Sequence, residues 1–273
     1  MSIFNRESLP YTIERTILIA VLSALALLCW IVLWKGGDIA HVAHNFGAQL
    51  HNHHSGYHSA TSYSFMAIFI ASWSIMSIAM MLPTTIPIVA FFHKFTENRA
   101  DRVLLLSLLV LGYVGTWTVF GFLIYFQLAF IKWALASFSF LSEYMWTGPP
   151  IILIFAGLFQ FTDIKYRCLD KCRSPLSFIT ERWRDTKEKW DAFMLGVDHG
   201  KFCIGCCWAL MILMFAVGFG SVLWMLILAL VMGVEKNIKW GRKIGKPVGY
   251  ILIVSGLAML IYNFFHSSHT MMH

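Results

Sequence analysis

Long runs of apolar residues alternate with short polar segments along most of the chain. A helix that crosses a bilayer needs about 20 predominantly apolar residues, and several runs reach this length. The clear candidates are Thr16–Trp34, Phe65–Phe92, Val103–Tyr125 and Pro247–Phe264. The first of these runs is too long for the apolar core of a secretory signal, so it is expected to be an uncleaved anchor. The pattern predicts an all-α, polytopic integral membrane helical bundle.

The remaining apolar stretches are less regular. A shorter run covers Ile151–Phe161, and Phe202–Val234 is apolar throughout but interrupted at Gly218–Ser221. This longer stretch suits either a tight hairpin of two short spans or a re-entrant loop. Phe126–Leu141 follows the third run without a polar loop, so it is read as an interfacial helix or a bent continuation. Together these stretches predict about seven membrane segments.

Composition and charge support this class and give it an orientation. Hydrophobic residues make up 58% of the 273 positions and charged residues only 13%, against about a quarter in soluble domains. Of the 21 Lys and Arg residues, only Lys35 and Lys132 fall outside the segments expected on one side. The positive-inside rule therefore predicts a cytoplasmic N-terminus and an extracytoplasmic C-terminus. The cation-rich segments are the N-terminus, 93–102, the basic loop 163–201, and 235–246.

The net charge of +7 is thus explained by topology, and no nucleic-acid partner is expected. The basic loop 163–201 is expected in the cytoplasm, where it can also meet anionic lipid head groups. No nucleotide-binding loop, dinucleotide fingerprint, nucleophile elbow or zinc-protease motif is found, and the chain is not expected to be an enzyme, although the sequence leaves this open. The chain 1–273 is interpreted as a single membrane domain in the cell membrane.

Histidine is concentrated on the side expected to face away from the cytoplasm. Three of the eleven histidines are in the C-terminal tail, at His266, His269 and His273. Imidazole suits Cu(II), zinc and nickel, and the loop spacings allow pairs of rings to share a helical face. A polar loop that binds divalent ions only incidentally is an equally good reading. Six more lie in the outer loop 35–64: His41, His44, His51, His53, His54 and His58.

The six cysteines lie within the expected spans or at their cytoplasmic edge. Cys29 stands alone in the first span and is read as a buried apolar thiol. Cys168 and Cys172 have a spacing that suits either a metal site or two interfacial thiols. The other three cysteines form the compact string Cys203-Ile-Gly-Cys206-Cys207. Because the cytoplasm is reducing, a structural disulfide is not expected there.

On a helix, one face of this region carries several soft ligands. His199, Cys203, Cys206, Cys207 and Met214 fall within an arc of about 100° at 3.6 residues per turn. Thiolate and thioether sulfur form the set that selects Cu(I), and ionisable groups at membrane depth indicate a functional site. We expect three thiolate ligands with the imidazole as the fourth, for copper, with zinc as the alternative metal. A redox dithiol and ordinary packing of Cys and Met are the competing interpretations.

The second run contributes thioethers. Met76 and Met80 share a helical face, a spacing that is also common in helical cores. With Met214 they would act as auxiliary ligands if this face meets the cysteine-bearing face. Pro83 and Pro87 are expected to kink the span and to open a cavity.

At these residues the chain resembles a bacterial and archaeal family of unknown function, described as predicted metal-binding integral membrane proteins. The resemblance covers residues 65–240, and its most specific part is the CxGCCW motif at 203–208. It implies a membrane protein that binds metal and has no defined activity. The histidine-rich loop at 41–58 departs from the family pattern. The other matching residues are Trp73, Met76, Ala79, Met80, Met81, Pro83, Gly112, Tyr113, Trp117, Gln160, Lys165, Cys168, Leu169, Cys172, Arg173, Pro175, Gly196, His199, Gly200, Met211, Glu235 and Lys236.

The leading hypothesis is an integral membrane metal-binding protein that handles copper by binding it, relaying it or loading it onto a partner. The partners expected are the lipid bilayer and another membrane or periplasmic protein. One alternative is a membrane thiol-disulfide oxidoreductase that cycles Cys203/Cys206 or Cys206/Cys207. No second cysteine pair near the outer face is available to receive its electrons. The other alternative is an accessory subunit whose apolar spans pack within a membrane complex.

Overall fold

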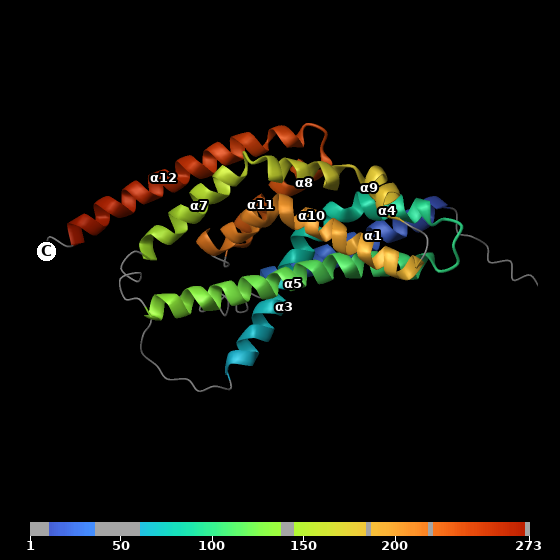
Figure 1. The fold of residues 1–273 in the computed structure, drawn as a ribbon, viewed down its shortest axis with the longest axis horizontal. Helices are drawn as coiled ribbons and strands as arrows, with labels where there is room; N and C mark the ends of the chain where they lie inside the picture. The colour runs from blue at the N-terminus through green and yellow to red at the C-terminus, as the bar shows by residue number, and fades with distance from the viewer. Residues whose placement is uncertain (1–10, 36–60, 138–144, 184–186, 218–220, 271–273) are drawn as a thin grey trace, which may run out of the picture.

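The computed structural model describes residues 11–35, 61–137, 145–183, 187–217 and 221–270, which form helices joined by short turns (Figure 1). The all-α expectation is confirmed for these residues, none of which is in a strand. The helices are α1 (Tyr11–Lys35), α3 (Thr61–Met81), α4 (Ile86–Phe95), α5 (Arg102–Ser137), α7 (Gly148–Phe159), α8 (Asp163–Arg173), α9 (Pro175–Arg182), α10 (Glu188–Val217), α11 (Val222–Asn237) and α12 (Gly245–Thr270), with 3-10 turns at Leu82–Thr85, Met145–Thr147 and Gly241–Lys243.

Five segments of this fold are long and apolar enough to cross a membrane. In the first and the last of them only 17% of the apolar window is buried, so most of their apolar side chains face outward. Such exposure is unusual in water and ordinary in lipid. α7 is a sixth apolar helix but has only 12 residues. The five segments are Glu14–Lys35, Ser64–Phe95, Arg102–Ala134, Glu188–Met214 and Gly241–Phe265.

Two helix boundaries differ from the expected spans. α5 continues without interruption from Arg102 to Ser137, so the stretch after Tyr125 extends this helix rather than forming a separate one. α10 begins at Glu188, well before the apolar run, and carries that run to Val217. The rest of the run forms α11, while residues 218–220 at the expected break lie outside the described residues.

Pro83 interrupts the second span, as its sequence predicts. α3 ends at Met81, and a 3-10 turn precedes α4. Because proline has no N–H group, the Ala79 carbonyl loses its usual partner one turn later. Trp30 Nε1 of α1 donates to this carbonyl oxygen at 3.1 Å, and Thr84 Oγ1 donates to the Met81 carbonyl at 2.7 Å. Side chains therefore satisfy the backbone where the helix breaks.

Glycines allow α5 and α10 to pack closely against each other. A Cβ atom on Gly112 would lie 2.3 Å from the Phe193 carbonyl oxygen, and one on Gly196 would lie 2.0 Å from the Leu109 carbonyl oxygen. Small residues permit this backbone approach in membrane helices. The contact brings the middle of α5, with Tyr113, against the cysteine-bearing face of α10. On the other side of α10, α7 and α12 lie side by side (Figure 1).

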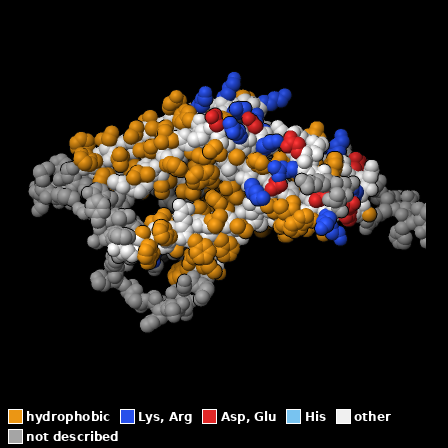
Figure 2. All heavy atoms as spheres, in the orientation of Figure 1, with side chains coloured by type: hydrophobic (Ala, Val, Ile, Leu, Met, Phe, Trp, Pro, Cys, Tyr) orange, Lys and Arg blue, Asp and Glu red, His pale blue; other side chains and the backbone are white. Residues whose placement is uncertain are grey.

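Charged side chains gather at one end of the molecule, around α4, α8 and α9, while hydrophobic side chains cover most of the remaining visible face (Figure 2). Ion pairs tie together segments that are distant in sequence. Their N–O distances are 2.7 Å for Arg102–Glu14, 2.5 Å for Arg99–Glu188 and 3.0 Å for Arg242–Asp170. The cation-rich segments singled out by the sequence therefore adjoin one another in space.

Candidate metal centre

Three buried thiols lie on the inner face of α10. Cys203, Cys206 and Cys207 are each at most 2% exposed. They share this face because residues three and four apart are neighbours on a helix. The thiols of Cys206 and Cys207 donate to the Cys203 carbonyl oxygen at 3.1 and 2.9 Å. All six cysteines of the chain are free thiols in the structure.

Two polar groups from other helices converge on the Cys203 sulfur. Lys236 Nζ, near the C-terminal end of α11, lies 2.9 Å from this atom. The Tyr113 hydroxyl of α5 lies 3.0 Å from the same sulfur and 3.3 Å from the Met81 carbonyl oxygen. A buried ammonium group therefore has a sulfur atom as its closest recorded partner.

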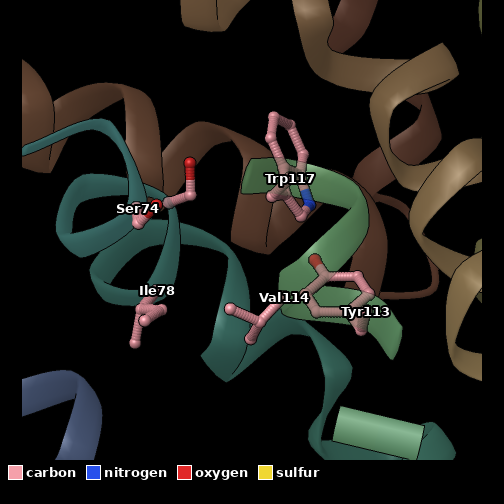
Figure 3. Close-up of a pocket in the computed structure, with 6 residues that line it drawn as sticks. Ser74, Ile78, Tyr113, Val114 and Trp117 are labelled. Atoms are coloured by element: carbon pink, nitrogen blue, oxygen red, sulfur yellow. The ribbon is translucent and has the colours of Figure 1, made fainter. Parts of the chain in front are cut away.

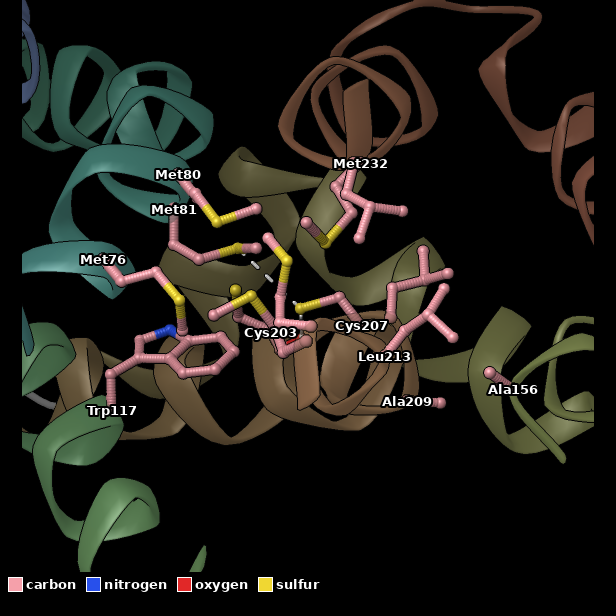
Figure 4. Close-up of a cluster of buried hydrophobic side chains, with 14 of the residues drawn as sticks. Met76, Met80, Met81, Trp117, Ala156, Cys203, Cys207, Ala209, Leu213 and Met232 are labelled. Carbon is pink, nitrogen blue, oxygen red and sulfur yellow. Dashed lines mark hydrogen bonds between the residues drawn. The ribbon is translucent and has the colours of Figure 1, made fainter. Parts of the chain in front are cut away.

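Met81, the last residue of α3, brings a thioether to the same point. Its Sδ lies 3.8 Å from Cys207 Sγ and 3.5 Å from Lys236 Nζ. The Lys236 Nζ atom is also 3.8 Å from Cys207 Sγ. Figure 4 shows Met81, Cys203 and Cys207 reaching into one space between α3 and α10. We call these three residues the sulfur centre.

The auxiliary methionines expected from the sequence lie in the same core. Met76, Met80 and Met214 are at most 2% exposed and belong to the buried cluster that contains the sulfur centre. Figure 4 shows the first two on the α3 side of this cluster. The thioether face of α3 and the cysteine-bearing face of α10 therefore adjoin. Their roles as ligands stay a prediction.

The α8 cysteines approach α10 from the charged end. Cys168 and Cys172 are partly exposed. A hydrogen bond with Cys206, together with burial, raises the pKa of Cys172 well above its usual value, and burial raises the pKa of Cys168. A Cβ atom on Gly205 would lie only 2.6 Å from Cys168 Sγ. The glycine of the CxGCC string thus makes room for a sulfur of α8.

His199 lies one turn before Cys203, in an aromatic environment. Its ring centroid is 5.6 Å from that of Tyr113 and 5.6 Å from that of Phe178. The side chain is 5% exposed, and its Nδ1 atom has no hydrogen-bond partner among the described residues. These contacts place the imidazole beside Tyr113 rather than in the sulfur centre, and its role as fourth ligand stays a prediction.

A second buried polar group fixes the position of Lys236. Lys165 Nζ donates to Glu235 Oε1 at 2.7 Å and also to Gln160 Oε1. The Lys165 and Glu235 side chains are 0% and 3% exposed. Arg173 Nη1 donates to the Glu235 carbonyl oxygen at 2.6 Å. These contacts join the end of α11 to α8, and so they hold the residue that follows Glu235 against the sulfur centre.

The donor set fits a soft ion better than a hard one. Within the described ranges, no three His, Cys, Asp or Glu side chains are grouped as a metal site. The sulfur centre consists instead of two thiols and one thioether, the combination that suits Cu(I). Two sulfurs that each lie about 2.3 Å from one ion are separated by roughly 3.8 to 4.6 Å. The distance between Met81 Sδ and Cys207 Sγ, 3.8 Å, falls within this range.

A narrow hollow borders the centre between α3 and α5 (Figure 3). It is too narrow to hold a water molecule. Tyr113 separates the hollow from the sulfur centre, because its hydroxyl points to Cys203. The hollow is lined by Ser74, Ser77, Ile78, Tyr113, Val114 and Trp117.

Three residues that were not predicted as ligands contact the sulfur centre or belong to it. Met81, Tyr113 and Lys236 all contact the sulfurs of Cys203 or Cys207. Each belongs to the pattern that carries the family resemblance, which is the signal that pointed to them.

The expected outer ligands cannot be placed. The six histidines of the outer loop fall within residues 36–60, which lie outside the described residues, and His273 also lies outside them. The backbone of His266 and His269 belongs to the end of α12. The outer loop therefore stays a prediction.

The fold and the sulfur centre together define a helical protein with membrane-length apolar segments and a soft-metal donor set in its core. Residues 70–259 match the family described as PpoB2, copper chaperone, and the chain belongs to this family. The expected resemblance to a metal-binding family is confirmed as membership of a copper-related family, whereas identity with the CxGCCW family stays a prediction. No curated protein and no solved structure matches the chain. The matched range contains the sulfur centre and the α8 cysteines.

Proposed function

We propose that this protein binds Cu(I) as cargo at the sulfur centre, within a membrane, and delivers it to a partner protein. One observation carries the proposal: two buried thiols of α10 and a thioether of α3 all lie within 3.8 Å of one atom, Lys236 Nζ. Membership of a copper chaperone family supports copper as the metal. Sulfur ligands favour the monovalent ion that is stable in a reducing cytoplasm.

The proposed roles follow from position. Cys203 and Cys207 supply thiolates and Met81 supplies the thioether. Cys206 is the next thiol outward, since it interacts with Cys172 of α8. A row of sulfurs thus leads from the partly exposed α8 cysteines, including Cys168, to the buried centre. Met76, Met80 and Met214 are auxiliary thioethers within the same core, and His199 is the outermost candidate ligand.

Metal binding by purified protein tests the site. The chain in detergent or nanodiscs would be titrated anaerobically with Cu(I) against a colorimetric chelator. We expect one tightly bound ion in the wild type and its loss in the double variant Cys203→Ser/Cys207→Ser. Cys29→Ser is the matched control, because Cys29 is a buried thiol on α1, outside the sulfur centre. Equal copper content in all three proteins would refute the assignment. A redox-dependent alkylation shift without bound copper would favour a thiol oxidoreductase instead.

We also propose seven membrane segments with a cytoplasmic N-terminus. The segments are α1, α3 with α4, α5, α7, α10, α11 and α12. The ion pairs that join the cation-rich segments at one end of the molecule support this orientation. Topology reporters fused after residue 273 and within the basic loop 163–201 test it. An exported reporter is expected to be active at the C-terminus and inactive in the basic loop, and the reverse result would overturn the orientation.

The outer histidines would then collect copper or receive it on the extracytoplasmic side. Replacing the six loop histidines from His41 to His58 with Asn leaves the sulfur centre intact. We expect copper binding at the centre to persist while uptake by or release from intact cells changes. Loss of the bound Cu(I) in purified protein would instead show that the loop belongs to the same site.

A further inference from the structure

Lys236 brings a buried positive charge into direct contact with the sulfur centre. Its ammonium group lies 2.9 Å from Cys203 Sγ, 3.5 Å from Met81 Sδ and 3.8 Å from Cys207 Sγ. The residue is only 7% exposed. A buried charge is stable only when it is paired, and all three recorded partners of this one are atoms of the sulfur centre.

The neighbouring carboxylate does not neutralise this ammonium group. Glu235 precedes Lys236 in the chain, but its carboxylate is paired with Lys165 of α8. The Lys236 charge therefore adds to the charge of whatever the sulfur centre holds. Electrostatic interactions are strong at such distances in a buried site.

We infer that Lys236 makes the sulfur centre selective for monovalent soft ions over divalent ones. This inference rests on the proposed function, since it concerns the same site. Two metal-bound thiolates and one ammonium group carry one net negative charge. Cu(I) brings this charge to zero, and the protons displaced from the two thiols leave to solvent. Zn(II) leaves one uncompensated positive charge in a buried site, which is unfavourable.

The ammonium group of Lys236 beside the sulfur ligands has two consequences that the ligand type alone would not produce. Soft divalent ions are disfavoured even though thiolates suit them, because the discrimination is by charge. The selectivity also requires that the ammonium group stay in place when the ion binds. The contacts of Glu235 with Lys165 and Arg173 of α8 hold that end of α11.

The test compares isoelectronic ions that differ in charge: Cu(I) with Zn(II), and Ag(I) with Cd(II). The purified chain would be titrated with each ion under anaerobic conditions. In the wild type we expect Ag(I) to bind at least 100-fold more tightly than Cd(II). In Lys236→Met this ratio should fall at least tenfold, mainly because Cd(II) binds more tightly. Lys236→Arg should retain the ratio.

Lys239→Met is the matched control, because it removes an exposed positive charge three residues away. An unchanged ratio in folded Lys236→Met would overturn the inference, and Lys236→Gln serves if the Met variant does not fold. Wild-type protein that binds Cd(II) as tightly as Ag(I) would overturn it without any variant. Failure of the proposed function is a separate outcome, in which the wild type binds neither Cu(I) nor Ag(I).

Discussion

Two buried lysines of this protein lie close together but have different partners. Lys165 is fully buried and is neutralised by the Glu235 carboxylate, with Gln160 as a second acceptor. Lys236 follows Glu235 directly, yet its ammonium group faces sulfur. The end of α11 therefore carries two adjacent residues with different roles. Glu235 forms an ion pair with Lys165, whereas the ammonium group of Lys236 contacts only sulfur atoms among its hydrogen-bond partners in the described residues.

The difference shows how a buried charge can serve structure or function. A lysine paired with a carboxylate has its charge fully compensated, so it fixes helices in place. When a lysine is paired with thiols, its positive charge is compensated only to the extent that the thiols are deprotonated, and a bound ion changes this balance. We therefore expect substitutions near Lys165 to lower stability and substitutions near Lys236 to change metal binding.

The largest effect is expected on the ion-pair side of this comparison. Glu235→Gln leaves the Lys165 charge buried without its carboxylate, which typically costs about 3–5 kcal/mol. Thermal or denaturant unfolding in detergent measures this loss. Glu181→Gln removes an exposed ion pair with Lys171 and should leave the unfolding transition unchanged. A stability for Glu235→Gln equal to that of the wild type would contradict the structural role of the pair.

On the sulfur side the expected effect falls on affinity. Cys203→Ser removes the thiol nearest to Lys236, and we expect Cu(I) to bind about 100-fold more weakly, a loss of about 2.8 kcal/mol. The unfolding transition should move much less than in Glu235→Gln. Chelator competition and unfolding of the same preparations separate the two effects. If Cys203→Ser lost stability but kept its affinity for Cu(I), this thiol would have a structural role rather than a role in metal binding.

The helices and the residues on their faces could largely be predicted from local sequence. Helical periodicity alone placed Cys203, Cys206 and Cys207 on one face, and all three are buried there. The break at Pro83 also followed from the chemistry of proline. These features depend on residues within a few turns of one another, which a sequence pattern records directly.

The contacts between helices could not be predicted in this way. Lys236 counted among the cytoplasmic cations, and the positive-inside rule explained its charge without requiring a partner. Met81 comes from a segment more than 100 residues away from Cys207, and its thioether reaches the centre only because α3 ends there. The packing of α3 and α11 on the cysteine-bearing face of α10 decides these contacts, and no local pattern encodes it.

Adding a single methyl group where α8 packs on α10 should lower the stability of the protein. Gly205→Ala places a Cβ atom 2.6 Å from Cys168 Sγ, and overpacking of this kind costs about 1–3 kcal/mol. Unfolding measurements should show this loss. Gly233→Ala is the control, since its Cβ atom meets nothing within 4 Å and alanine favours the helix. Equal stabilities for the two variants would mean that α8 gives way easily, so that its cysteines are not held against α10.

The smallest effect is expected at Tyr113, which contacts the sulfur centre without supplying a ligand. Tyr113→Phe keeps the ring against His199 but removes the hydroxyl that lies 3.0 Å from Cys203 Sγ. Loss of one buried hydrogen bond costs about 0.5–1.5 kcal/mol, and we expect Cu(I) affinity to fall by no more than about tenfold. Tyr250→Phe, on an exposed ring of α12, controls for the chemical change. If Tyr113→Phe weakened Cu(I) binding as much as Cys203→Ser does, the hydroxyl would be part of the binding site. Lys236 would then no longer be the main polar partner of the sulfur centre.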